Sequence, residues 1–122
     1  MLKMKEKNNI LSLEEVLKLA KKVRNWNSPY EINLDEFNGS VNSVCINMDK
    51  RKGGFIRGRT DYSIFVKNEN LDLGDYYINT KKQSEVGEQM YQLFKDAEKI
   101  MKRNESKKRR DTITYVKRLI SD

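Results

Sequence analysis

Histidine is absent from this chain of 122 residues, and cysteine, proline and tryptophan occur once each. Without histidine, the chain lacks the side chain that most often acts as a general base and most often binds transition metals. The lone cysteine, Cys45, forms no intramolecular disulfide and is too little for a cysteine-based zinc site. These absences predict a protein that binds its ligand without transforming it, and that uses no metal and no cofactor.

Carboxylates are the remaining candidates for acid–base chemistry. They occur together at Asp35 and Glu36, and again at Asp72 and Asp75, in asparagine-rich segments where turns or strand ends are expected. Neither pair has the D-x-D-x-D-G order of a calcium loop. Because acidic residues are ordinary in turns, we predict that the chain is not an enzyme.

Long apolar runs are also missing. No stretch approaches the roughly 20 residues that a helix needs to span a bilayer. Residues 1–9 are rich in lysine but lead into an amphipathic segment, unlike a secretory signal peptide. We therefore expect a cytoplasmic protein without a membrane partner, folded as a single domain over residues 1–122.

An N-terminal helix is predicted over residues 12–25. Ser12 and Glu15 have the spacing of a capping box, in which each side chain meets a free backbone amide of the other. Pro29 ends the helical region, because it disfavours helical angles at Ser28. The apolar residues recur at helical spacing and define one face: Leu13, Val16, Leu17, Ala20 and Val23.

Between residues 30 and 80 the apolar period changes from 3.6 to 2, which predicts four strands. Turn signals at Asn38–Gly39, at Gly53–Gly54 and over residues 68–70 separate them at hairpin spacing. We expect an antiparallel meander with one packed face and one open face. The inward residues are predicted to be Tyr30, Ile32, Leu34, Val44, Ile46, Met48, Tyr62, Ile64, Val66, Tyr76 and Ile78.

After residue 80 the helical period returns and predicts two C-terminal helices, over residues 84–104 and 111–121. Asp111 is a suitable cap for the second. The pattern of residues 104–111 itself leaves open whether the helix breaks there or continues. The predicted fold class is α+β, with the N-terminal helix, a four-stranded antiparallel meander and two C-terminal helices packed on one face of the sheet.

The net charge of +7 is unevenly distributed. Residues 30–80 have a small acidic excess, whereas the segments on either side are basic. One basic cluster spans residues 50–59 and the other residues 99–110; each is compatible with a phosphate site or with an ordinary solvated surface. Arginine forks bind phosphate bidentately, so the candidate ligand-binding residues are Arg57, Arg59, Arg109 and Arg110.

Aromatic residues extend this list of candidates. Phe65 and Tyr77 are expected on the open sheet face, where they could stack a base, or else pack under a loop or in a dimer interface. Of these two, Phe65 is a candidate ligand-binding residue. Tyr115, in the last predicted helix, is the other aromatic candidate. Trp26 is expected at the edge of the core rather than in a site.

The chain is small and rich in residues with AT-rich codons (17 Lys, 12 Asn and 9 Ile in all), and residues 30–122 are predicted to form an antiparallel sheet followed by two C-terminal helices. This layout resembles the phage anti-Thoeris signal-sequestering proteins, the sponges. The resemblance implies a phage protein that forms oligomers and captures a cyclic ADP-ribose-type immune signal without cleaving it. By this interpretation Arg57, Arg109, Phe65 and Tyr115 are pocket candidates.

The sequence thus predicts a non-enzymatic protein that captures an anionic nucleotide ligand, with a cyclic ADP-ribose-type or cyclic nucleotide signal as the leading form. Binding of DNA or RNA is the alternative, and it requires a continuous basic stripe. An anti-CRISPR-like inhibitor is a further alternative, although a charge of +7 is unlike a DNA mimic. The two amphipathic C-terminal segments carry more apolar surface than a small sheet needs, which predicts a homo-oligomer, a dimer or larger.

Overall fold

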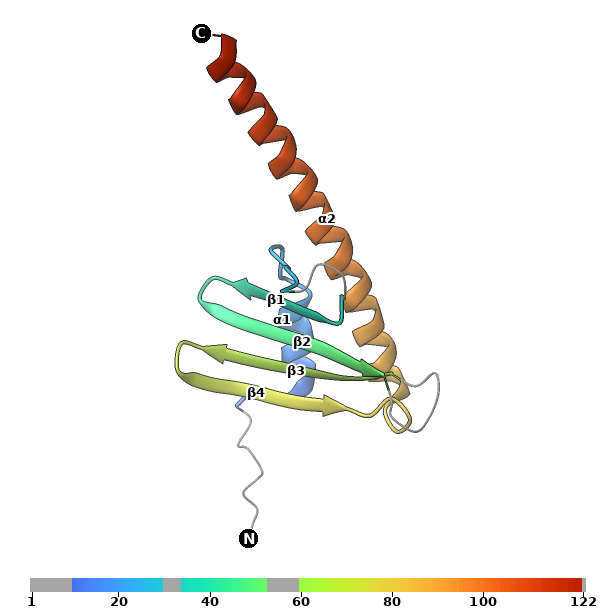
Figure 1. The fold of residues 1–122 in the computed structure, drawn as a ribbon. Helices are drawn as coiled ribbons and strands as arrows, with labels where there is room; N and C mark the ends of the chain where they lie inside the picture. The colour runs from blue at the N-terminus through green and yellow to red at the C-terminus, as the bar shows by residue number, and fades with distance from the viewer. Residues whose placement is uncertain (1–9, 30–33, 53–59, 122) are drawn as a thin grey trace.

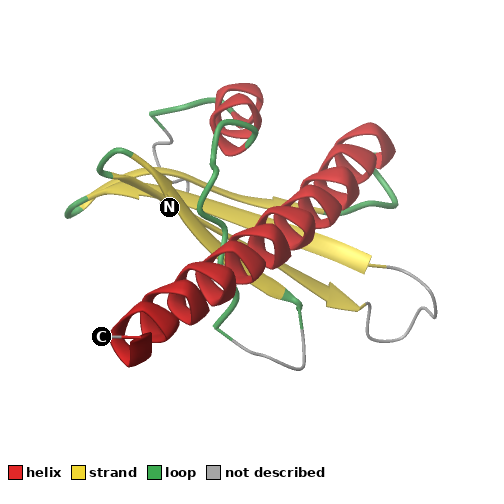
Figure 2. Cartoon of the chain, turned by 90° about the horizontal axis from the view of Figure 1, so that it is seen from above, coloured by secondary structure: helices red, strands yellow, loops and turns green. Residues whose placement is uncertain are grey.

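The structure is a computed structural model that describes residues 10–29, 34–52 and 60–121. Its four strands form one antiparallel sheet in the order β1-β2-β3-β4, and both helices cover the same face of it (Figures 1 and 2). The predicted α+β class and four-stranded meander are confirmed, with two helices in place of three. The elements are α1 (Leu13–Ala20), β1 (Glu36–Val41), β2 (Val44–Lys52), β3 (Thr60–Asn68), β4 (Leu71–Ile78) and α2 (Ser84–Ser121).

Helix α1 begins as predicted. The Glu15 backbone amide donates to Ser12 Oγ at 3.1 Å, and the Ser12 amide donates to Glu15 Oε1 at 2.9 Å. The helix ends at Ala20, five residues before the predicted end at residue 25. Residues 21–27 instead turn back to the sheet, where Asn27 pairs with Asn38 of β1. This path buries Trp26 in the core, as expected.

The first strand differs from its prediction. Asn38 and Gly39 lie inside β1, and the β1–β2 turn is at Asn42–Ser43, with Asn42 at a φ of 56°. Leu34 precedes β1, and residues 30–33 and the Gly53–Gly54 turn lie outside the described residues. Gly39 is needed here for close packing rather than for a turn, because Trp26 and Val23 lie directly above its Cα.

Replacing Gly39 with alanine is expected to destabilise the fold by about 1–3 kcal/mol. A Cβ there would lie 2.5 Å from Val23 Cγ1 and 2.8 Å from Trp26 Cε3, so both buried side chains would have to move. Urea denaturation followed by circular dichroism measures the loss. Ser43→Ala, at an exposed position in the neighbouring β1–β2 turn, is the control; equal stability of Gly39→Ala and the wild type would contradict this packing.

The hydrophobic core lies between the sheet and the two helices. The inward residues predicted for the centres of β2, β3 and β4 are buried as expected: Ile46, Met48, Tyr62, Ile64, Val66 and Ile78. Phe94 of α2 packs at their centre, with its ring centroid 5.6 Å from that of Phe37 and 5.4 Å from that of Tyr62. The β3–β4 turn also follows its prediction, at Glu69–Asn70.

Helix α2 is a single helix of 38 residues, so the prediction of two separate C-terminal helices is wrong, and residues 104–111, whose pattern left a break open, continue the helix. No glycine or proline occurs after Gly87, and seven of the ten residues 102–111 are lysine, arginine or glutamate, which have good helix propensity. Every residue from Lys102 to Ser121 is exposed. We call this segment the arm; it is about 30 Å long at 1.5 Å per residue, and its C-terminal part projects beyond the sheet (Figure 1).

Candidate functional site

A row of cations follows one side of α2. Lys99, Arg103, Lys107, Arg110 and Lys117 are spaced by four, four, three and seven residues, which places them along the same side of a helix. All five are exposed. The buried residues Ala97 and Met101 of the same helix face the core, so the row points away from the sheet. We call these five residues the basic stripe.

The stripe is continuous only because α2 does not break. Lys117 belongs to the last predicted helix, over residues 111–121. The other four cations lie in the predicted helix over residues 84–104 or in residues 104–111 between the two. In one helix they cover about 27 Å. Glu105 comes two residues after Arg103 and therefore lies on the other side of the helix. The basic cluster was predicted from the sequence, but the alignment of its cations on one side of a helix was not. The spacing of four, four and three residues between Lys99 and Arg110 is the pattern that indicates this alignment.

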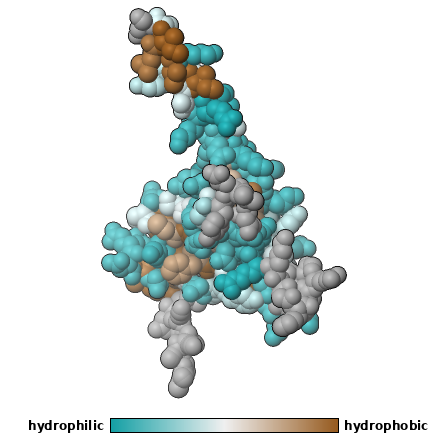
Figure 3. Space-filling view, viewed as in Figure 1, coloured by the Kyte–Doolittle hydropathy of each residue, from teal (hydrophilic) through white to brown (hydrophobic). Residues whose placement is uncertain are grey.

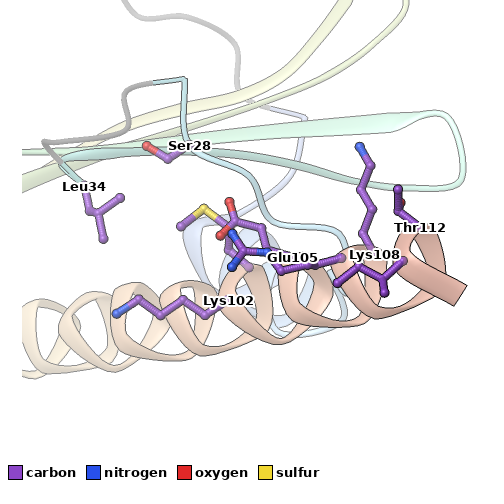
Figure 4. A pocket seen from close by; sticks show the side chains of 9 residues that line it. Ser28, Leu34, Lys102, Glu105, Lys108 and Thr112 are labelled. Atoms are coloured by element: carbon purple, nitrogen blue, oxygen red, sulfur yellow. The ribbon is translucent and has the colours of Figure 1, made fainter. Parts of the chain in front are cut away.

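A groove of about 660 Å³ lies between the arm and the segment that precedes β1. Figure 4 shows Ser28 and Leu34 on that segment, across from Lys102 on α2. Three cations and one carboxylate line the groove together with apolar side chains. Its lining residues are Ser28, Leu34, Met101, Lys102, Glu105, Lys108, Arg109, Thr112 and Ile113.

The four predicted ligand-binding residues that the structure describes do not form one site within a single copy of the chain. Arg109 lines the groove, Arg110 belongs to the basic stripe, and Tyr115 is exposed farther along the arm. Phe65 lies on the open face of the sheet, on the side away from both helices. Arg57 and Arg59 lie outside the described residues. Groove residues Ser28 and Leu34 were not identified from sequence, because nothing in their local pattern points to a site.

The open face of the sheet is acidic. Phe65 pairs with Asn47 of β2 and Asp75 of β4 rather than with arginines. Tyr77 Oη donates to the buried carboxylate of Asp61 at 2.5 Å, which restrains its ring. Repulsion by carboxylates disfavours a phosphate at this face. Among the described residues, the charged side chains here are Glu36, Asp49, Asp61, Asp72 and Asp75 against Arg51 and Lys67.

The candidate acid–base residues have structural partners or lie in solvent. Glu36 Oε2 accepts from the Asn47 side chain at 2.7 Å, and Asp72 and Asp75 are exposed. Burial, reinforced by the neighbouring Tyr91, raises the pKa of the Tyr62 hydroxyl, so this group is protonated at neutral pH.

Within residues 10–29, 34–52 and 60–121, no group of three or more aspartate, glutamate, cysteine or histidine side chains could hold a metal ion. Neither of the two described helices is long and apolar enough to cross a membrane.

The comparisons with known proteins add no family to this description. No family model, curated protein or solved structure matches the chain. The functional argument is therefore carried by the residues of the arm and the groove.

Proposed function

We propose that this chain is a non-enzymatic protein that binds nucleic acid along the basic stripe. The observation that carries the proposal is the stripe itself, five exposed cations aligned over about 27 Å of one helix side. That length corresponds to roughly eight base pairs of B-DNA. An isolated helix has a diameter of about 10–12 Å, close to the width of a major groove.

The arrangement of the cations favours an extended polyanion over a single small ligand. Neighbouring stripe residues are about one helical turn apart and project in parallel, so they do not converge on one point. Each can meet a different phosphate of a regular backbone. The arm is also exposed along its full described length, which lets a duplex approach without a change in the core.

Fluorescence anisotropy with a labelled 20-base-pair DNA duplex tests the proposal. If all five cations contact phosphates, the logarithm of the association constant falls against log salt with a slope of about −4 to −5. Between 50 and 200 mM salt, this is a loss of roughly 300- to 1,000-fold. Absence of binding at 50 mM salt, or a slope near zero, would overturn it.

Nucleotide capture in the groove is a second candidate, supported by the position of Arg109. Together with Lys102 and Lys108 it offers cations beside the apolar wall of Leu34 and Met101, which suits a nucleotide with its phosphates at one end. A ligand of the cyclic ADP-ribose type would fit the resemblance to anti-Thoeris sponges. Glu105 in the same groove opposes an anionic ligand.

A thermal-shift panel separates the two candidates. Cyclic nucleotides and ADP-ribose derivatives that raise the unfolding temperature at moderate salt, with the rise lost in Arg109→Ala, would support capture in the groove. Stabilisation by polynucleotides only, abolished by salt, would support the basic stripe.

A further inference from the structure

A second, apolar side of the arm is exposed. Ile113, Val116, Leu119 and Ile120 recur at helical spacing, and Ile120 is 76% exposed. Figure 3 shows them as the brown end of the arm. At about 100° per residue, they are centred on a different side of the helix from the basic stripe. We call these four residues the apolar arm face.

We propose that the apolar arm face docks on the open sheet face of a second copy of the chain. The open face has a hollow of about 600 Å³ between β1, β2 and β3. Cys45 and Phe65 contribute apolar side chains to its wall, the backbone of Gly39 lines it as well, and Asn38, Ser40, Asn47 and Lys67 are polar residues of the same lining. Burial of the aliphatic side chains of the arm in such a hollow would remove apolar surface of both copies from water.

Charge complementarity supports the open sheet face as the surface on which the arm docks. The arm carries eight cations and two acids, whereas the described open face carries five acids and two cations. Glu36 and Asp49 lie directly opposite each other on β1 and β2, where they accept hydrogen bonds from Asn47 and Ser63. Like charges in such a pair repel, so a cation beside them would be stabilising. Arg109 precedes Ile113 by one turn and is therefore placed to meet them.

The same charges disfavour parallel pairing of two arms. Parallel arms would bring their basic segments, residues 102–110, close together, whereas antiparallel arms joined through residues 113–120 would place these segments at opposite ends and are distinguished by the cross-linking test below. The dimensions also favour the sheet. The arm is about 30 Å long, and the nine-residue strands β2 and β3 each extend about 30 Å.

Docking through the apolar arm face leaves the basic stripe facing solvent. The inference therefore does not depend on the proposed nucleic-acid binding, and each can fail without the other. It does, however, place Arg109 at the contact between two copies, so a nucleotide in the groove and the docked sheet would compete for this residue.

The lone cysteine provides a direct test, because Cys45 is exposed and lines the hollow. Val116→Cys places a second thiol on the apolar arm face, and mild oxidation is expected to link position 116 to Cys45 of another copy, as identified by peptide mass spectrometry. Thr114→Cys, on the other side of the arm, is the matched control and should react at least tenfold more slowly. Links only between two copies of position 116 would overturn the proposal in favour of paired arms.

Light scattering on the full chain gives the second test. The wild type is expected to be dimeric or larger at 100 µM, and Val116→Asp with Ile120→Asp to raise the dissociation constant at least tenfold. Both positions are exposed, so circular dichroism should show an unchanged fold. Arg109→Glu should also weaken association, and adding Glu36→Lys with Asp49→Lys should restore it. A monomeric wild type, or failure of the charge reversal to restore association, would overturn the proposal.

Discussion

Replacing Arg103, Lys107 and Arg110 together with glutamine is expected to weaken binding to a 20-base-pair duplex by roughly 100- to 1,000-fold at 0.1 M salt. Each cation that neutralises a phosphate releases about 0.9 counterion, which is worth roughly tenfold in affinity at that salt concentration. The salt slope should fall by about three at the same time. Fluorescence anisotropy over a salt series measures both quantities, and the exposure of all three side chains leaves the fold intact.

A matched control separates the stripe from net charge. Lys18, Lys22 and Lys82 are also exposed, and none of them lies on the arm. Replacing these three with glutamine removes the same charge and should reduce affinity by less than about tenfold through the general field of the protein. Equal losses in the two triple variants would show that DNA responds to net charge and not to the aligned stripe.

The second large effect concerns the core. Phe94→Ala is expected to lower the free energy of unfolding by about 3–5 kcal/mol. The ring is buried and packs against both Phe37 and Tyr62, and the Lys50 ammonium lies 5.3 Å from its centroid. Its removal leaves a cavity between α2 and the sheet. Since domains of this size are stabilised by about 5–15 kcal/mol, urea denaturation should show a large fall in the midpoint.

Tyr91→Ala is the control for this substitution. Tyr91 is three residues earlier in the same helix and is 57% exposed. The change in helix propensity is similar to that at position 94, whereas little buried surface is lost, so a change below about 1 kcal/mol is expected. A loss of less than 1 kcal/mol for Phe94→Ala would mean that α2 is not held by this aromatic cluster.

Local patterns predicted much of this fold correctly. The capping box at Ser12 and Glu15 places the start of α1, and strict alternation in β2 and β3 identifies which side chains enter the core. These features depend on interactions between residues close in sequence or on a strand's period of two. The helix start and the inward side chains of the strands can therefore be predicted without knowledge of the segments that pack against them.

Long-range packing explains where the prediction failed. Asn38–Gly39 has the composition of a hairpin turn, yet Gly39 lies in a strand because Trp26, thirteen residues away, packs on it. Residues 21–25 continue a helical pattern, but the chain leaves the helix so that residue 27 can pair with β1. In both places a distant contact outweighed local propensity.

For the candidate site, the sequence by itself determined which residues carry the positive charge, and that most of it lies outside the sheet region. Only the tertiary structure decided that α2 runs unbroken to Ser121, which aligns Lys99 to Lys117 in one stripe, and that Phe65 lies on the sheet face opposite the one that α2 covers. The physical reason is that charge is a property of each residue by itself. The direction in which a side chain points depends instead on whether neighbouring segments share one helix axis and on which face of the sheet the core covers.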